Sequence, residues 1–171
     1  MSNSYRNAHI AWLACLGALL RKVRSEGLMS IESEIETPEA ENTLFRLFPQ
    51  VLEAPYLEFA TDILRMMVGG TLEADELQVY VDHYIAGLTA KRGVDESLLR
   101  AIWLTLWASM KGYAPQVACE FGRQAIPLEH KPSFAELEQV LRDSRDAWRQ
   151  RGNGEVDLDA AIADFMASLE A

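Results

Sequence analysis

LLRKVRSEGLMSIESEIETP, residues 19–38, has the pattern of the second half of a long amphipathic helix that ends at a proline. At about 100° per residue, the apolar side chains of this region share one helix face, and most charged side chains lie opposite. The apolar face comprises Trp12, Leu13, Leu16, Leu19, Leu20, Val23, Gly27 and Ile31. The opposite face carries Arg21, Arg24, Ser25 and Glu32. We expect the apolar face to dock on a core. The charged face is either a solvated surface or a contact surface.

The composition describes an ordinary globular protein with an acidic balance. The chain has 171 residues, 49% of them hydrophobic and 25% charged, which is enough for one domain with a core. Its formal net charge of −10 argues against nucleic acid as a partner, because phosphate binding needs an excess of Lys and Arg. A local basic patch remains at residues 21–24.

The residues that usually bind metals are scattered along the chain. His9, His83 and His130 are isolated from one another, and no sequence pattern of metal ligands surrounds them. Cys15 and Cys119 lie in apolar settings, so we predict two reduced, buried thiols. We therefore expect no metal, no cofactor and no small-molecule substrate.

The two most apolar runs are too short to cross a bilayer. Residues 8–20 and 101–110 each fall below the roughly 18–20 residues that a membrane helix requires. We therefore expect a chain without a membrane span that is soluble without detergent and conducts no ions.

The apolar periodicity of the chain, with the proline, glycine and capping residues that separate its periodic segments, predicts an all-α fold of about five to six helices without a sheet. The expected helices cover residues 8–34, 50–68, 72–88, 95–111 and 133–150, with shorter pieces at 38–45 and 116–124. Thr71 looks like an N-cap, and Ser133 with Glu136 forms the pattern of a capping box. We expect the helix that begins there to pack Phe134, Leu137 and Leu141 against residues 21–70. Residues 1–150 are predicted to form one domain, and residues 151–171 a linker and a weakly attached helix.

The helix expected at residues 95–111 is apolar almost all round, which is typical of a core or of an oligomer interface. One small domain was not expected to cover Trp103, Trp107 and their neighbours completely. We therefore predict a monomer or a weak dimer that hides part of this surface.

Two blocks of the sequence resemble the cytoplasmic part of flagellar motor stator A subunits, the MotA/PomA family. The first, residues 21–70, has a basic helix, EGL, an acidic stretch, a proline and then Phe59, Asp62, Leu64, Arg65 and Gly70 at the family spacing. The second, residues 111–138, contains GYAPQVA-x-EFGR followed by PSF-x-ELE. The similar regions extend over residues 19–90 and 98–147, joined by a charged segment at about 88–98. In the family a pair of membrane helices separates the blocks and another pair precedes them; this chain has neither, and whether they were removed or are naturally absent stays open.

The resemblance implies a torque-coupling role in flagellar rotation. In the family, the cytoplasmic helices contact the rotor protein FliG through a basic residue before EGL and an acidic residue after it, which here are Arg24 and Glu32. Arg21 and Lys22 are expected to assist. The family also implies a stator B subunit and further A subunits as partners. Because the membrane helices are missing, the ion pathway that those helices build is missing as well.

Two other function classes compete with this hypothesis. The first is a soluble adaptor or regulator that kept the fold without motor function. The second is an enzyme, for which Glu32 and Glu36 offer a carboxylate pair, but no nucleophile–base set or glycine-rich phosphate loop accompanies them. Glu120 and Arg123 form either a buried ion pair or a helix-end contact. We expect no catalytic activity.

Overall fold

The structure is a computed structural model that describes residues 2–70, 72–152 and 167. Its described part contains seven α-helices, three short 3-10 helices and no strand, which confirms the all-α prediction. The α-helices are α1 (Ser2–Glu26), α2 (Glu32–Glu36), α3 (Tyr56–Gly69), α4 (Ala74–Thr89), α5 (Glu96–Met110), α6 (Pro115–Gln124) and α7 (Phe134–Gly152). The 3-10 helices are η1 (Leu28–Ile31), η2 (Phe45–Leu47) and η3 (Pro49–Leu52).

The first predicted helix, residues 8–34, is wrong at its C-terminal end. Helix α1 stops at Glu26, Gly27 adopts φ 89°, and the chain continues through η1 into the separate five-residue α2. A φ of this sign suits glycine, which has no Cβ to clash. The apolar periodicity runs through the break because Ile31 is fully buried, although it no longer lies on the same helix as Leu16.

The expected short helix at residues 38–45 is replaced by turns and by η2 and η3. The Ala40 amide donates to the Thr37 carbonyl, and the Thr43 hydroxyl lies 2.6 Å from the Pro38 carbonyl oxygen. The Leu44 amide donates to the buried Glu34 carboxylate at 2.5 Å. These local bonds satisfy the backbone of residues 37–44 without helical pairing.

Helix α4 also begins later than predicted. Its N-cap is Glu73 rather than Thr71, which lies outside the described residues. The Glu73 side chain accepts from the backbone of Glu76, and the Glu76 side chain accepts from the Glu73 amide at 2.9 Å. The Glu73 carboxylate therefore caps this helix in place of the Thr71 hydroxyl expected from the sequence.

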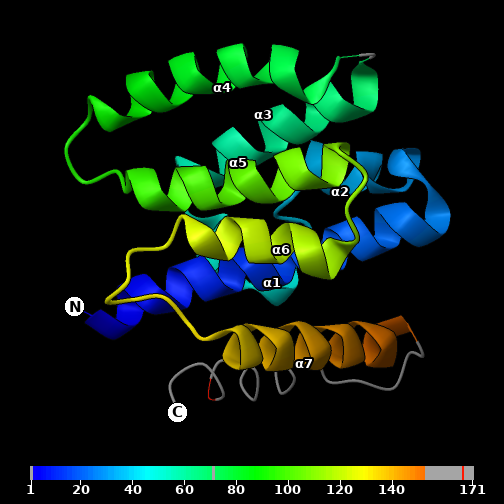
Figure 1. Cartoon of the computed structure of the whole chain (residues 1–171). Coiled ribbons are helices and arrows are strands. Elements are labelled where there is room, and N and C mark those ends of the chain that lie inside the picture. The colour runs from blue at the N-terminus through cyan, green and yellow to red at the C-terminus, as the bar shows by residue number, and fades with distance from the viewer. Residues whose placement is uncertain (1, 71, 153–166, 168–171) are drawn as a thin grey trace.

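Helix α5 lies inside the assembly of helices. Figure 1 shows α4 along one edge and α7 along the opposite edge, with α5, α6 and α1 between them. Trp103 and Leu106 of α5 are buried, and the Trp103 indole N–H donates to the Gln78 side chain of α4 at 2.7 Å. Helices α4 and α6 cover most of α5, while Trp107 and Met110 stay partly exposed, so this domain does not cover the helix completely, as expected.

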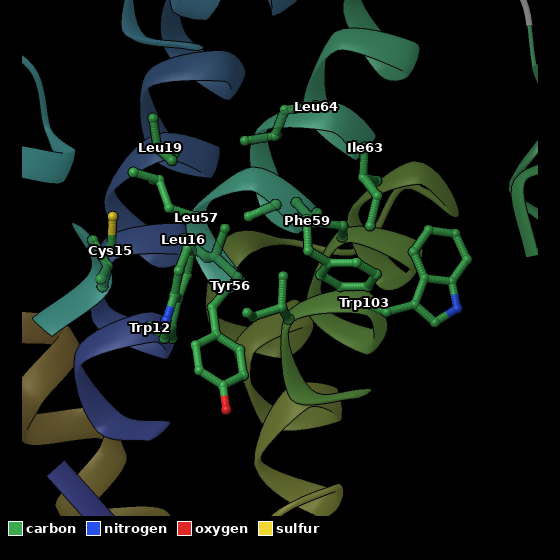
Figure 2. Packing of buried hydrophobic residues seen from close by; sticks show 14 of the residues in the cluster. Trp12, Cys15, Leu16, Leu19, Tyr56, Leu57, Phe59, Ile63, Leu64 and Trp103 are labelled. Carbon is green, nitrogen blue, oxygen red and sulfur yellow. The ribbon is translucent and has the colours of Figure 1, made fainter. Parts of the chain in front are cut away.

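Side chains from α1, α3 and α5 meet in one hydrophobic cluster (Figure 2). Leu16 and Leu19 of α1 are fully buried, as are Phe59 and Ile63 of α3. Burying one such side chain stabilises the fold by roughly 1.5–3 kcal/mol. The face that the sequence assigned to the core therefore holds α1 in the centre of the molecule.

Helices α5 and α6 pack closely at Gly122. A Cβ at this position would lie 2.7 Å from the Ala101 carbonyl oxygen and 2.7 Å from the Leu13 side chain, and would also overlap Thr105. Only glycine allows this approach of α6 to α5 and α1. Cys119, one turn earlier on α6, is buried with its thiol 3.4 Å from the Leu13 carbonyl oxygen. Both cysteines are buried free thiols, as predicted, and burial raises the pKa of Cys119 to about 12.

The predicted capping box starts α7. The Ser133 amide donates to the Glu136 carboxylate at 2.6 Å, and the Ser133 hydroxyl lies 3.2 Å from the Glu136 amide. Leu137 and Leu141 are buried in a cluster with Leu13, which precedes residues 21–70, and from within that range Arg21 donates to the Leu141 carbonyl. Phe134 is 54% exposed, so its predicted packing is wrong. The helix extends to Gly152, and the helix predicted at residues 157–169 lies outside the described residues apart from residue 167.

Candidate functional site

Arg24 and Glu32 lie on the two sides of the turn at Gly27. Arg24 is in the last turn of α1 and Glu32 is the first residue of α2, so the prediction that both share one helix is wrong. Each charge suits its helix end, because a cation stabilises a C-terminus and an anion an N-terminus. Both side chains are exposed, and no described residue forms an ion pair with either of them. Both charges therefore face solvent.

An exposed apolar side chain, Met29, lies in η1 between the two charged residues along the chain. Its exposed fraction is 61%, among the highest of the large apolar residues that the structure describes. Protein interfaces combine an apolar centre, in which methionine is enriched, with a polar rim. We call Arg24, Met29 and Glu32 the turn surface.

Lys22 and Arg21 point toward other parts of the chain. The Lys22 ammonium lies 2.8 Å from the carboxylate of Glu34, which is only 4% exposed. The Arg21 guanidinium donates to the Leu141 carbonyl of α7 at 2.8 Å, and burial lowers its pKa. The four charged residues singled out in the sequence therefore divide into an exposed pair and a pair that binds the fold together.

The turn surface is anchored directly to the core. Ile31 is fully buried, and Ile35 is 2% exposed. The Glu34 carboxylate joins Lys22 of α1 to the Leu44 amide of the following loop. A segment held by buried contacts of this kind opens less readily than a loose loop.

A small groove beside Arg24 was not predicted from the sequence. It has a volume of about 160 Å³ and runs between the end of α1 and the α5–α6 turn. Tyr113, 47% exposed, forms part of its wall, and its ring lies 5.2 Å from the Phe121 ring. The signal in the sequence is the GYAP motif, which we used only for the resemblance.

One group of residues resembles a hydrolase triad by composition, but its geometry differs. The His9 Nε2 lies 2.9 Å from the Ser97 hydroxyl and 3.3 Å from Asp95 Oδ2. In a triad the carboxylate and the nucleophile contact opposite nitrogens of the imidazole. Here both contact the same nitrogen, and Asp95 is the N-cap of α5, accepting from the Ser97 amide at 2.8 Å. This group is best explained as a capping network.

The remaining sequence candidates have structural partners or are solvated. Arg123 donates to both carboxylate oxygens of Glu120, and also to the Pro132 carbonyl at 2.8 Å. The hydrogen bonds from Arg123 lower the pKa of Glu120. Glu32 and Glu36 are both exposed. Within residues 2–70 and 72–152, no three His, Cys, Asp or Glu side chains form a group that could hold a metal ion.

Among the described residues, no helix is both long enough and apolar enough to cross a membrane.

Comparison with known proteins supports the resemblance seen in the two blocks. Motility protein A of Salmonella typhimurium is 22% identical over 220 aligned positions, which cover 85% of this chain and 74% of the relative. Motility protein A of Escherichia coli K12 is 22% identical over 212 positions, covering 81% and 72%. Chemotaxis protein LafT of Vibrio parahaemolyticus is 35% identical over 77 positions, covering 44% and 27%. No family model and no solved structure matches the chain.

The two longer alignments contain more positions than the 171 residues of this chain, so each relative has residues without a counterpart here. The similarity to the two motility proteins nevertheless extends over most of the chain, and the third relative is a chemotaxis protein. The chain is a relative of the flagellar motor stator A subunits, the MotA/PomA family.

Proposed function

We propose that the chain is the torque-coupling module of a stator A subunit and contacts the rotor protein FliG through the turn surface. The observation that carries the proposal is the pair of opposite, solvent-facing charges on either side of Met29. The relationship to motility protein A supports it. The module acts by binding and transmitting force, without a catalytic step and without an ion channel of its own.

The physical chemistry of the turn surface suits a contact that forms and breaks repeatedly. An exposed ion pair contributes only about 0–1 kcal/mol, so release costs little. Opposite charges on one surface still orient an incoming partner, because like charges repel and unlike charges attract along its approach. Arg21 and Lys22 assist indirectly, by positioning the turn surface. Arg21 binds the Leu141 carbonyl of α7, and Lys22 binds Glu34, which also accepts from the Leu44 amide.

The proposal includes a location and further partners. In a motor, this module faces the cytoplasm, where the rotor protein is found, and its further partners are the stator B subunit and other A subunits. An acidic chain with exposed opposite charges is an unsuitable binder of nucleic acid, so the partner is a protein with complementary charges.

Charge reversal with rescue is the decisive experiment. Arg24→Glu and Glu32→Lys, each placed in a complete stator, should reduce swimming speed, and a complementary reversal on the rotor protein should restore part of it. Arg100→Glu on α5 is the matched control, because Arg100 is also exposed but lies away from the turn surface. The stability of the isolated domain should change by no more than about 0.5 kcal/mol in each variant.

Normal swimming by both reversals at low salt and high load, where electrostatic coupling is strongest, would place the contact elsewhere on the domain. A loss of swimming that no rotor reversal restores would do the same. The alternative, a soluble adaptor, makes a different prediction. The separately expressed chain would then change the swimming speed of cells whose stator carries the normal residues, and charge reversals in the chain would alter that change.

A further inference from the structure

A second charged site lies where α1 and α6 meet α7. A pocket of about 220 Å³ is lined by Arg21, Gln116, Glu138, Leu141, Arg142 and Arg145. Its volume is well above the roughly 30 Å³ that one water molecule occupies in the liquid, so a small polyatomic group fits. Of its lining residues, only Arg21 also has a role in the proposed rotor contact, where it positions the turn surface.

The charge of this pocket is opposite to that of the chain. Three guanidinium groups face one carboxylate there, although the whole chain carries a formal charge of −10. The one carboxylate, Glu138, is shared: it lies 3.3 Å from Gln116 Nε2 and 3.9 Å from Arg142 Nη2. Cys119, close to Arg21, stays a neutral thiol near pH 7 because burial raises its pKa to about 12.

Arg21 has an unused donor at this place. Its Nη2 donates to the Leu141 carbonyl at 2.8 Å, whereas its Nη1 is buried and no described residue accepts a hydrogen bond from it. A buried donor without an acceptor costs about 1–3 kcal/mol, more when charged, so native structures seldom leave one unsatisfied. Burial lowers the pKa of Arg21, and repulsion from nearby Arg145 and Arg149 acts in the same direction, whereas Asp146, which lies 3.3 Å from Arg145, acts against it.

We propose that this pocket binds an oxyanion, a phosphate or carboxylate group, between Arg21, Arg142 and Arg145, with the Gln116 amide as a further donor. The planar guanidinium fork matches the spacing of two oxyanion oxygens, which an ammonium group does not. An oxyanion would supply the acceptor that Nη1 lacks and would reduce the repulsion among the arginines. It would also join α1 to α7, since the arginines come from both helices.

The oxyanion has two possible sources. It is either a free or protein-borne group from solution, or a carboxylate of this chain, since residues 153–171 contain five Asp and Glu residues and no Lys or Arg. If the oxyanion is the chain's own carboxylate, it already occupies the pocket and competes with added phosphate. If it comes from solution, added phosphate binds without this competition.

Titration of the full chain with inorganic phosphate, at ionic strength held constant with NaCl, tests the site. Phosphate should raise the thermal midpoint and shift the guanidinium NMR signals of Arg21. Arg142→Gln with Arg145→Gln should weaken binding about tenfold or more, because charge-assisted hydrogen bonds to the oxyanion are lost. Arg92→Gln with Arg100→Gln is the matched control, since it removes the same charge from exposed positions and should leave binding unchanged.

A second full-length variant, Glu155→Gln with Asp157→Asn and Asp159→Asn, separates the two sources. If phosphate binds this variant but not the unaltered chain, and Arg142 and Arg145 are needed, the occupant is the chain's own carboxylate. If phosphate binds both equally, it comes from solution. If phosphate affects neither more than NaCl does, or if the control pair weakens binding as much as Arg142 and Arg145, the pocket is no oxyanion site.

Discussion

The middle and the C-terminal end of α1 differ sharply in what surrounds them. Leu13 and Leu16, in its middle, are fully buried against α3, α6 and α7. Arg24, in its last turn, faces solvent together with Glu32 across the Gly27 turn. One helix therefore supplies both the centre of the core and the edge of the proposed contact surface.

This difference teaches that charge alone does not identify a contact residue. Lys22 and Arg24 are two residues apart and both basic, yet Lys22 pairs with a buried carboxylate while Arg24 has no ion-pair partner among the described residues. The helix turns by about 200° between them, which reverses the direction of the side chain relative to the core. Matched substitutions at buried and at exposed positions should therefore distinguish residues that stabilise the fold from residues that contact a partner.

The largest effect is expected in the interior, at Gly122. Gly122→Ala should destabilise the fold by about 3 kcal/mol, because the new Cβ would overlap backbone at Ala101, which cannot rotate away. Gly87→Ala on α4 is the matched control: its Cβ would meet no atom within 4 Å, so we expect a gain of about 0.5–1 kcal/mol. Urea unfolding measures both, and equal midpoints for the two variants would show that α6 can move away from α5.

The next effect compares the two basic residues. Lys22→Met should cost about 3 kcal/mol, because it leaves the buried Glu34 carboxylate without its cation. Arg24→Met should change stability by less than about 0.5 kcal/mol, since the side chain is exposed. The measurement is the urea midpoint of each variant. A comparable cost for both would contradict the division of this basic stretch into structural and contact residues.

A smaller effect is expected at the start of α7. Ser133→Ala should cost about 0.5–2 kcal/mol, because the Glu136 amide loses its hydroxyl acceptor. Ser25→Ala is the control, since that hydroxyl only donates to carbonyls of its own helix and should cost no more than about 0.5 kcal/mol. Thermal denaturation distinguishes them. An unchanged midpoint for Ser133→Ala would mean that the Glu136–Arg6 pair alone secures this helix end.

The smallest effect concerns pH and the Glu120–Arg123 pair. Hydrogen bonds from Arg123 lower the pKa of Glu120 below its ordinary value of 4.5, so its stabilisation is complete above that pH and is lost as pH falls through the lowered value. Glu120→Gln should therefore be less stable than the original chain at pH 7, with the difference narrowing below about pH 4.5. Thermal midpoints from pH 7 to 3 check this, and a constant difference would contradict the linkage.

The local signals of the sequence predicted much of the fold. Apolar periodicity identified the buried face of α1, and Ser133 with Glu136 identified the start of α7, because helix periodicity and capping depend on residues within one or two turns. The motifs at residues 111–138 identified the family through the order of the residues alone.

The break at Gly27 could not be predicted in this way. The EGL motif contains the glycine, but the same apolar period continues to Ile31, so periodicity favoured one unbroken helix. The exposure of Phe134 was missed for a related reason. It depends on which helix lies opposite, and the pattern of a single helix does not contain that information.

By itself, then, the sequence determined that the protein is all-α, which helix faces are apolar, where α7 begins and which family it resembles. These properties arise from interactions between neighbours in the chain. Tertiary structure alone decided that Lys22 and Arg21 bind Glu34 and Leu141 while Arg24 remains open, and that three arginines from two helices line one pocket. The physical reason is that the environment of a charge is set by groups distant in sequence, which meet only when the helices pack.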